Sequence, residues 1–114
     1  MLQVALDVLD LNSALRIARE CVKGGVDIIE AGTPLIKSVG MKAVRRLREE
    51  FPSTPLVADM KTMDTGYLEA SMAAKAGADI TTVLGVAEDV TTVSYTHLRA
   101  HETSLHLVCR LLLE

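Results

Sequence analysis

The chain has 114 residues, of which 49% are hydrophobic and 24% are charged, so we expect one packed domain rather than a disordered chain. The net charge of −3 argues against a nucleic-acid partner, because nucleic-acid-binding proteins carry a basic patch or stripe. No apolar run approaches the ~20 residues of a membrane span. The two cysteines form no paired motif, so a cytoplasmic protein without a membrane partner is expected.

Four short apolar runs have the length of buried β-strands: Leu2–Leu6, Val26–Ile29, Leu56–Ala58 and Asp79–Leu84. The ends of these runs lie roughly 25 residues apart, which leaves room for one helix and two loops between strands. Buried strands that alternate with helices predict a parallel sheet with right-handed crossovers. Part of a (β/α)₈ barrel and a doubly wound open sheet both fit this pattern.

The first predicted helix spans Leu11–Val22, where apolar residues recur at helical spacing. Asp10 or Asn12 can cap its start, and Gly24-Gly25 can end it. After a break at Gly32-Thr33-Pro34, a second helix spans Met41–Phe51, and its basic residues, including Arg48, are interpreted as a solvated face. A third helix carries three apolar residues on its predicted inner face, Leu68, Met72 and Ala76.

The joint between helix and strand occurs twice with nearly the same residues. Gly25-Val26-Asp27-Ile28 is matched by Gly77-Ala78-Asp79-Ile80. Asp27 and Asp79 stand at the starts of strands, and that end of a parallel barrel usually serves stability. We therefore assign these two residues no function.

The composition changes near residue 92. All seven Gly and all three Pro occur at or before Gly85, whereas all three His occur after residue 92. Residues 93–114 resemble translated adapter or assembly-junction sequence. We therefore expect a folded unit over residues 1–92 and a non-native tail over residues 93–114. A native terminal helix, or a metal pair at His97 and His101, is the alternative interpretation.

Three successive predicted strands end in an acidic residue: Asp7, Glu30 and Asp59. The carboxyl ends of parallel strands meet at one rim, where α/β proteins place their sites. Lys61 follows Asp59 by two residues and lies on the same side if the strand continues. Several carboxylates close together need a cation, and Mg²⁺ prefers oxygen ligands. The alternative is that each acid caps the helix that follows it.

The segment Asp59–Asp64 reads D-x-K-x-x-D, which resembles the signature of the orotidine 5′-monophosphate decarboxylase superfamily. Within it, Leu2–Asp7, Ile28–Ile36 and Lys61–Gly66 resemble the 3-hexulose-6-phosphate synthase family. The resemblance covers residues 1–92 almost continuously, with motifs from three strands in the same order and spacing. It implies a partial (β/α)₈ TIM barrel of about four βα units and, for the whole family protein, a homodimer.

The resemblance also implies an activity, the Mg²⁺-dependent aldol condensation of formaldehyde with ribulose 5-phosphate through an enediolate. Glu30 and Asp59 would hold the Mg²⁺ ion. Asp7 and Lys61 would bind the substrate and take part in catalysis. Asp64 would also take part in catalysis, by reaching into the partner's site. The family's phosphate loops belong to later strands, so we expect the chain alone to be inactive.

Three alternatives remain open. A 3-keto-L-gulonate-6-phosphate decarboxylase of the same superfamily would share these five residues, although Thr33–Ile36 and Thr62-Met63 favour the synthase. A phospho-receiver module would use Asp59 as phosphoacceptor and Thr81 or Thr82 as switch residue, but it needs paired acids after the first strand. The third alternative is a translated fragment with no activity of its own.

Overall fold

The computed structural model describes residues 1–93 and the backbone of residues 106–110. Strands and helices alternate along the chain, with two consecutive helices after the second strand. The elements are β1 (Gln3–Leu6), α1 (Leu11–Lys23), β2 (Ile28–Ala31), α2 (Thr33–Val39), α3 (Met41–Glu50), β3 (Leu56–Thr62), α4 (Gly66–Lys75), β4 (Ile80–Leu84) and β5 (His106–Arg110). No helix among the described residues is long and apolar enough to cross a membrane.

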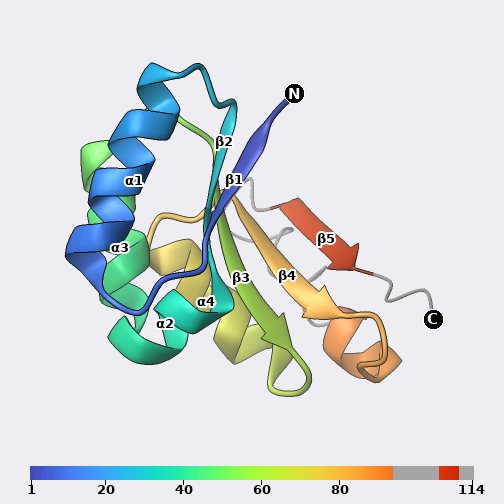
Figure 1. The fold of residues 1–114 in the computed structure, drawn as a ribbon. Helices are drawn as coiled ribbons and strands as arrows, with labels where there is room; N and C mark the ends of the chain where they lie inside the picture. The colour runs from blue at the N-terminus through green and yellow to red at the C-terminus, as the bar shows by residue number, and fades with distance from the viewer. Residues whose placement is uncertain (94–105, 111–114) are drawn as a thin grey trace.

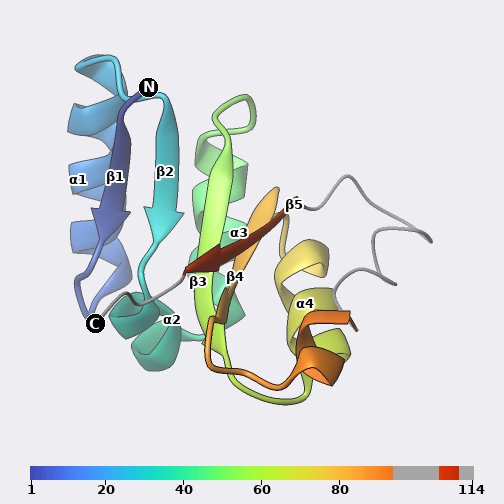
Figure 2. The same ribbon diagram turned by 90° about the vertical axis from the view of Figure 1, so that its right-hand side faces the viewer.

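All five strands form one parallel sheet in the order β1-β2-β3-β4-β5. The helices cover one face of this sheet (Figure 1), and Figure 2 looks onto the opposite face with α1 and α3 behind the strands. Strands that neighbour one another in chain order form the wall of a barrel, whereas a doubly wound sheet reverses its order at a switch point. The predicted partial (β/α)₈ barrel is therefore confirmed, and the open sheet of a phospho-receiver is excluded.

The hydrophobic core lies between the sheet and the helices. Its strand residues are alternate ones, and all are nearly inaccessible: Leu6, Ile29, Ala31, Leu56 and Ala58. Successive side chains of a strand point to opposite faces, so the residues between these point away from the helices. Four polar side chains occupy such positions on the helix-free face: Gln3, Glu30, Asp59 and Thr82. The alternation that buries the core thus also brings these polar groups together.

The predicted signals at the two ends of α1 are confirmed. Asp10 is the N-cap, and its carboxylate accepts a hydrogen bond from the backbone N–H of Ser13 at 2.9 Å. Gly24 is the C-cap, and Gly25 follows with a φ of 88°, a conformation that glycine adopts without a steric penalty. Both ends of the helix are therefore fixed by residues next to it in sequence.

The repeated Gly-x-Asp-Ile segment between helix and strand makes the same pair of hydrogen bonds at both of its occurrences. The carboxylate of Asp27 accepts a hydrogen bond from the backbone N–H of Leu2 at 2.6 Å, and its own N–H donates to the Leu2 carbonyl at 2.9 Å. Asp79 does the same with Leu56, at 2.8 and 2.9 Å. Each aspartate therefore ties the start of its strand to the start of the preceding strand, which agrees with a structural role.

Two expectations about the helices are corrected. The predicted break at residues 32–34 is the start of α2, with Pro34 in its first turn, where a missing N–H costs nothing. Leu68 and Met72, predicted to face inward, are 60% and 43% exposed. Helix α4 instead buries the small residues Gly66, Ala70 and Ala73. Small side chains allow this helix to lie close to the sheet, so the larger apolar residues are not its packing face.

Part of residues 93–114, which lie outside the predicted folded unit, adds a strand to the sheet. Residues 106–110 form β5, which pairs in parallel with β4 from Ile80 opposite His106 to Leu84 opposite Arg110. An edge strand offers unpaired backbone groups to any extended segment, so this pairing does not depend on the origin of the added strand. The non-native origin of residues 93–114 stays a prediction, and the histidine pair at residues 97 and 101 lies outside the described residues.

The predicted solvated face of α3 is corrected at Arg48, which is only partly exposed. Its guanidinium pairs with the Asp79 carboxylate and donates to the carbonyl of Gly77 at 2.8 Å. It also donates to three carbonyls of the loop before β3, those of Phe51, Pro52 and Thr54, at 3.0–3.2 Å. The planar guanidinium of Arg48 therefore binds both the loop that precedes β3 and the loop that precedes β4, so it fixes the amino-terminal ends of these two strands.

We predict that Arg48→Ala lowers the free energy of unfolding by about 2–3 kcal/mol, because several hydrogen bonds from a charged donor are lost together. Arg48→Lys should recover only part of this loss, since an ammonium lacks the planar fork. Urea denaturation followed by circular dichroism measures the effect. Arg45→Ala, on the exposed side of the same helix, is the matched control and should change stability by less than about 0.5 kcal/mol. Equal losses in the two alanine variants would contradict the assignment.

Candidate functional site

The helix-free face of the sheet is hollowed where four strands contribute polar side chains. A cavity of about 400 Å³ is lined there by Met1, Gln3, Ile28, Glu30, Val57, Asp59, Ile80 and Thr82. The strand residues in this lining are separated by two along each strand, as the alternation of a β-strand requires. Two acids from neighbouring strands, Glu30 and Asp59, therefore face the same cavity.

Asp59 is the most tightly held of these groups and is only 3% exposed. Its Oδ1 accepts a hydrogen bond from the Thr82 hydroxyl at 2.6 Å. Its Oδ2 pairs with the Lys61 ammonium and lies 3.0 Å from the hydroxyl of Thr33, which also reaches the Asp59 carbonyl oxygen at 2.8 Å. Donors from β3, β4 and the start of α2 thus fix the orientation of one carboxylate.

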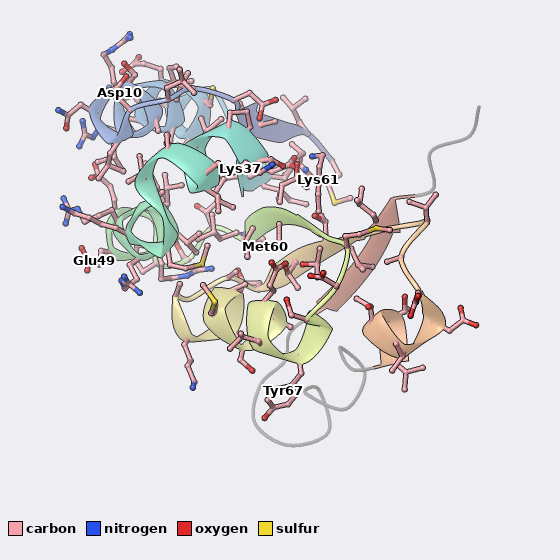
Figure 3. The ribbon with its side chains drawn as sticks, turned by 90° about the horizontal axis from the view of Figure 1, so that it is seen from below. Asp10, Lys37, Glu49, Met60, Lys61 and Tyr67 are labelled. Carbon is pink, nitrogen blue, oxygen red and sulfur yellow. The ribbon has the colours of Figure 1, made fainter. Side chains whose placement is uncertain are left out.

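Lys61 reaches this carboxylate from the end of β3. Its φ of 48° is in the left-handed region, and the pairing of β3 with β4 shifts register between Ala58 and Thr62. Its ammonium also donates to the Thr33 hydroxyl at 3.0 Å, and its side chain is 39% exposed. Figure 3, seen from the carboxyl ends of the strands, shows Lys61 on the inner side of the rim, whereas Tyr67 points outward from α4.

Glu30 is 9% exposed, and its Oε2 accepts a hydrogen bond from the Gln3 side chain. Burial raises the pKa of Glu30, the negative charge of Asp59 raises it further, and the Gln3 bond only partly opposes them. For Asp59, burial also acts to raise the pKa, but hydrogen bonds from Lys61, Thr82 and Thr33 outweigh it, so this pKa is lowered. Asp59 is therefore the more readily ionised acid, and a second negative charge on Glu30 is unfavourable without a cation.

Asp7 lies at the same rim, next to the loop that follows β2. Its Oδ1 packs so closely against Gly32 that a Cβ on that residue would come within 2.0 Å of it. Only glycine leaves room for the carboxylate there. Asp7 is otherwise exposed, so its carboxylate is open to a ligand at the rim.

Asp64 lies apart from the cluster. It is exposed in the loop between β3 and α4, where its carboxylate accepts a long hydrogen bond from the Thr65 hydroxyl at 3.4 Å. None of the contacts among the described residues joins it to Glu30 or Asp59. Thus the structure brings together three of the five predicted site residues, Glu30, Asp59 and Lys61, with Asp7 at the same rim and Asp64 outside the cavity.

The two buried carboxylates fit a hard divalent cation. They supply charged oxygen ligands from adjacent strands, and their mutual repulsion would be relieved by positive charge. Mg²⁺ is commonly held by only one or two carboxylates, with water and substrate oxygens completing the shell. The described residues contain no group of three or more acidic, histidine or cysteine side chains that could hold a metal.

Sequence reasoning gave no site role to Gln3 or Thr33 and treated Thr82 only as a receiver switch residue. All three contact the carboxylates directly, through their side chains. For Gln3 and Thr82 a signal was present, because a polar residue at an alternate position of a buried strand must point away from the apolar core. Thr33 has no comparable signal, since its contact depends on how α2 begins.

Comparisons with known proteins agree with one another. A model of the family described as "Orotidine 5'-phosphate decarboxylase / HUMPS family" matches residues 1–111. The 3-hexulose-6-phosphate synthases of Methylomonas aminofaciens and Mycobacterium gastri are 52% and 51% identical to this chain. These matches cover 75% and 79% of this chain, but only 41% and 43% of the two relatives.

Solved structures show the same relationship. A 3-hexulose-6-phosphate synthase superposes with a TM-score of 0.86 at 45% identity, over 93% of this chain and 51% of that one. A 3-keto-L-gulonate-6-phosphate decarboxylase from Vibrio cholerae gives 0.88 at 37% identity, over 98% and 52%. The chain thus spans about half the length of the proteins that it resembles. Its sheet order, its motifs and these matches together show that it belongs to the orotidine 5′-phosphate decarboxylase / HUMPS family.

Proposed function

We propose that this chain provides the metal-binding half of the active site of a 3-hexulose-6-phosphate synthase, which joins formaldehyde to ribulose 5-phosphate. The observation that carries the proposal is the meeting of Glu30 and Asp59 in one cavity on the helix-free face, with the Lys61 ammonium paired to Asp59. An aldol reaction needs a stabilised enediolate, and paired carboxylates that hold a cation beside an ammonium suit that charge. The high identity to two synthases supports this activity within the family.

Glu30 and Asp59 would hold Mg²⁺, which supplies a Lewis acid for substrate oxygens when it is bound. The hydroxyls of Thr33 and Thr82 would keep the Asp59 carboxylate in one orientation as the substrate enters. Lys61, held against Asp59, would hydrogen-bond the substrate and offset the negative charge that develops on it.

Asp7 and Asp64 would act at the edges of this centre. Asp7 would hydrogen-bond a substrate hydroxyl at the rim, where Gly32 leaves its carboxylate accessible. Asp64, on an exposed loop outside the cavity, would serve the site of a second copy in a homodimer. The exposed position of Asp64, outside the lining of its own chain's cavity, supports that role.

A decarboxylase acting on 3-keto-L-gulonate 6-phosphate is the second candidate. The enzyme from Vibrio cholerae superposes on nearly the whole chain, and a Streptococcus mutans relative at 34% identity was solved in complex with a sugar phosphate. The same carboxylates, lysine and metal would serve this activity. The choice between the two activities therefore rests on substrate assays rather than on the centre itself.

A chimera tests the proposed activity. Residues 1–92, which precede the change in composition, are joined to the part of the Methylomonas aminofaciens synthase that this chain does not match. We predict formaldehyde-dependent consumption of ribulose 5-phosphate, and a loss of about 100-fold or more with Asp59→Asn, because a charged ligand of the cation is removed. The chain of 114 residues by itself should show no aldol activity.

The control is Asp27→Asn, the same change at the opposite end of the sheet, which should leave the chimera's turnover within about twofold of the unchanged chimera. Full activity in the Asp59→Asn chimera would exclude Asp59 as a ligand. Decarboxylation of 3-keto-L-gulonate 6-phosphate without any aldol activity would establish the second candidate instead.

Metal binding can be measured on the chain itself. We predict that isothermal titration calorimetry with MgCl₂ detects one weak site, with a Kd of about 1 mM, because two carboxylates without substrate leave most of the ligand shell to water. Glu30→Gln and Asp59→Asn should each abolish the signal, while Asp79→Asn should retain it. An unchanged isotherm in either of the first two variants would contradict the proposed ligand pair.

Because the pKa of Glu30 is raised in the folded chain, the free energy of unfolding should fall as the pH rises and Glu30 ionises. Above the ordinary carboxyl value of 4.5, the unfolded chain releases the Glu30 proton more readily than the folded chain, so ionisation favours unfolding. Glu30→Gln should therefore raise the melting temperature at pH 7.5 without Mg²⁺, and the gain should vanish as the pH falls to 4.5. Thermal melts across this range measure the effect, and added Mg²⁺ should stabilise only the unchanged chain. A gain that is independent of pH would contradict the electrostatic cause.

A further inference from the structure

Thr82 makes two hydrogen bonds with one hydroxyl, and both partners belong to the candidate site. It accepts from the backbone N–H of Lys61 at 3.0 Å and donates to Oδ1 of Asp59 at 2.6 Å. Its side chain is almost fully buried on β4. The hydroxyl therefore donates its one proton to Asp59 and accepts the Lys61 N–H with a lone pair, and both partners belong to the neighbouring strand β3.

The contact with Lys61 occurs where the backbone departs from a regular strand. The register of β3 against β4 shifts between Ala58 and Thr62, and Lys61 has a left-handed φ of 48°. A non-glycine residue holds such a conformation only when its surroundings impose it. A shift of register also removes a regular ladder partner from the strand, and the Thr82 hydroxyl supplies an acceptor at that position.

The neighbouring Thr81 provides an internal comparison. Its hydroxyl donates to the carbonyl of Ala58 at 3.2 Å, and it is fully buried among residues that face away from the cavity. The two threonines therefore share a strand, a residue type and a hydrogen bond to β3. Of these two threonines, Thr82 is the one that hydrogen-bonds to Asp59 and Lys61.

We propose that Thr82 is a positioning residue whose single hydroxyl fixes both the orientation of the Asp59 carboxylate and the backbone conformation of Lys61. By holding the N–H of Lys61 and an oxygen of Asp59 together, it keeps the lysine in the strained conformation from which its ammonium reaches Asp59. In this role Thr82 acts through Asp59 and Lys61. The inference rests on the proposed function for the roles of Asp59 and Lys61, whereas the geometry that it explains stands on the hydrogen bonds alone.

The test compares Thr82→Val, which keeps the shape but has no hydroxyl, with Thr82→Ser, which keeps the hydroxyl, and with Thr81→Val as the matched control. Hydrogen exchange of the Lys61 amide, followed by NMR on the full chain, reads the positioning directly. We expect exchange about tenfold faster in Thr82→Val, close to the unchanged chain in Thr82→Ser, and unchanged in Thr81→Val. Mg²⁺ titration of the same samples should show a three- to tenfold weaker Kd only for Thr82→Val.

Each outcome decides the proposal. Unaltered exchange of the Lys61 amide in Thr82→Val overturns it, as does failure of Thr82→Ser to restore slow exchange. Equal acceleration in Thr81→Val overturns it as well, because the effect would then be a general loosening of β4. If the unchanged chain binds no Mg²⁺, the proposed function fails, while the exchange of the Lys61 amide still decides whether Thr82 positions it.

Discussion

The site depends on one buried carboxylate, that of Asp59, which would be unfavourable in this sheet without compensating donors. An ionised acid among apolar strands needs hydrogen bonds and opposite charge, and Asp59 receives them from Lys61, Thr33 and Thr82. These partners come from β3, α2 and β4, so the carboxylate joins three elements of the barrel wall. The neighbouring acid, Glu30, has only the Gln3 side chain as a hydrogen-bond donor among the described residues, and this difference in support is why the pKa values of the two acids move in opposite directions.

The opposite end of the sheet uses similar groups for a different purpose. Asp27 and Asp79 accept hydrogen bonds from the preceding strand, and Arg48 joins Asp79 to the loops at that end. Asp27 and Asp79 are occupied by backbone N–H groups and an arginine, whereas Glu30 and Asp59 face a cavity. The chain therefore separates structural aspartates from candidate functional ones along the direction of its strands.

Much of this arrangement follows from the sequence because it depends on local rules. Apolar runs and their spacing predicted the parallel strands, although β3 continues to Thr62 beyond the predicted strand end at Asp59. Of the three acids predicted at strand ends, Glu30 and Asp59 face one cavity. The N-cap Asp10 and the glycines after α1 were equally local. Because side chains alternate along a strand, Glu30 lies on the helix-free side of the sheet. A shift of β2 by one residue would turn Glu30 into the core.

The remaining features depend on contacts between elements, which the sequence pattern does not encode. Thr82 meets Lys61 because β3 shifts register, and Arg48 finds its carbonyls only after two loops have converged. The packing face of α4 is set by how closely the helix approaches the sheet, so Ala70 and Ala73 are buried where periodicity favoured Leu68. Propensity and spacing describe one element at a time, and these residues act between elements.

We propose that adjacent strands present two acids to one divalent ion. A crystal structure of the chain grown with Mn²⁺ in place of Mg²⁺, with anomalous diffraction to locate the metal, examines it most directly. We expect one anomalous peak in contact with oxygens of both Glu30 and Asp59, on the helix-free face. A peak bound elsewhere, or carboxylates too far apart to share the ion, would contradict it.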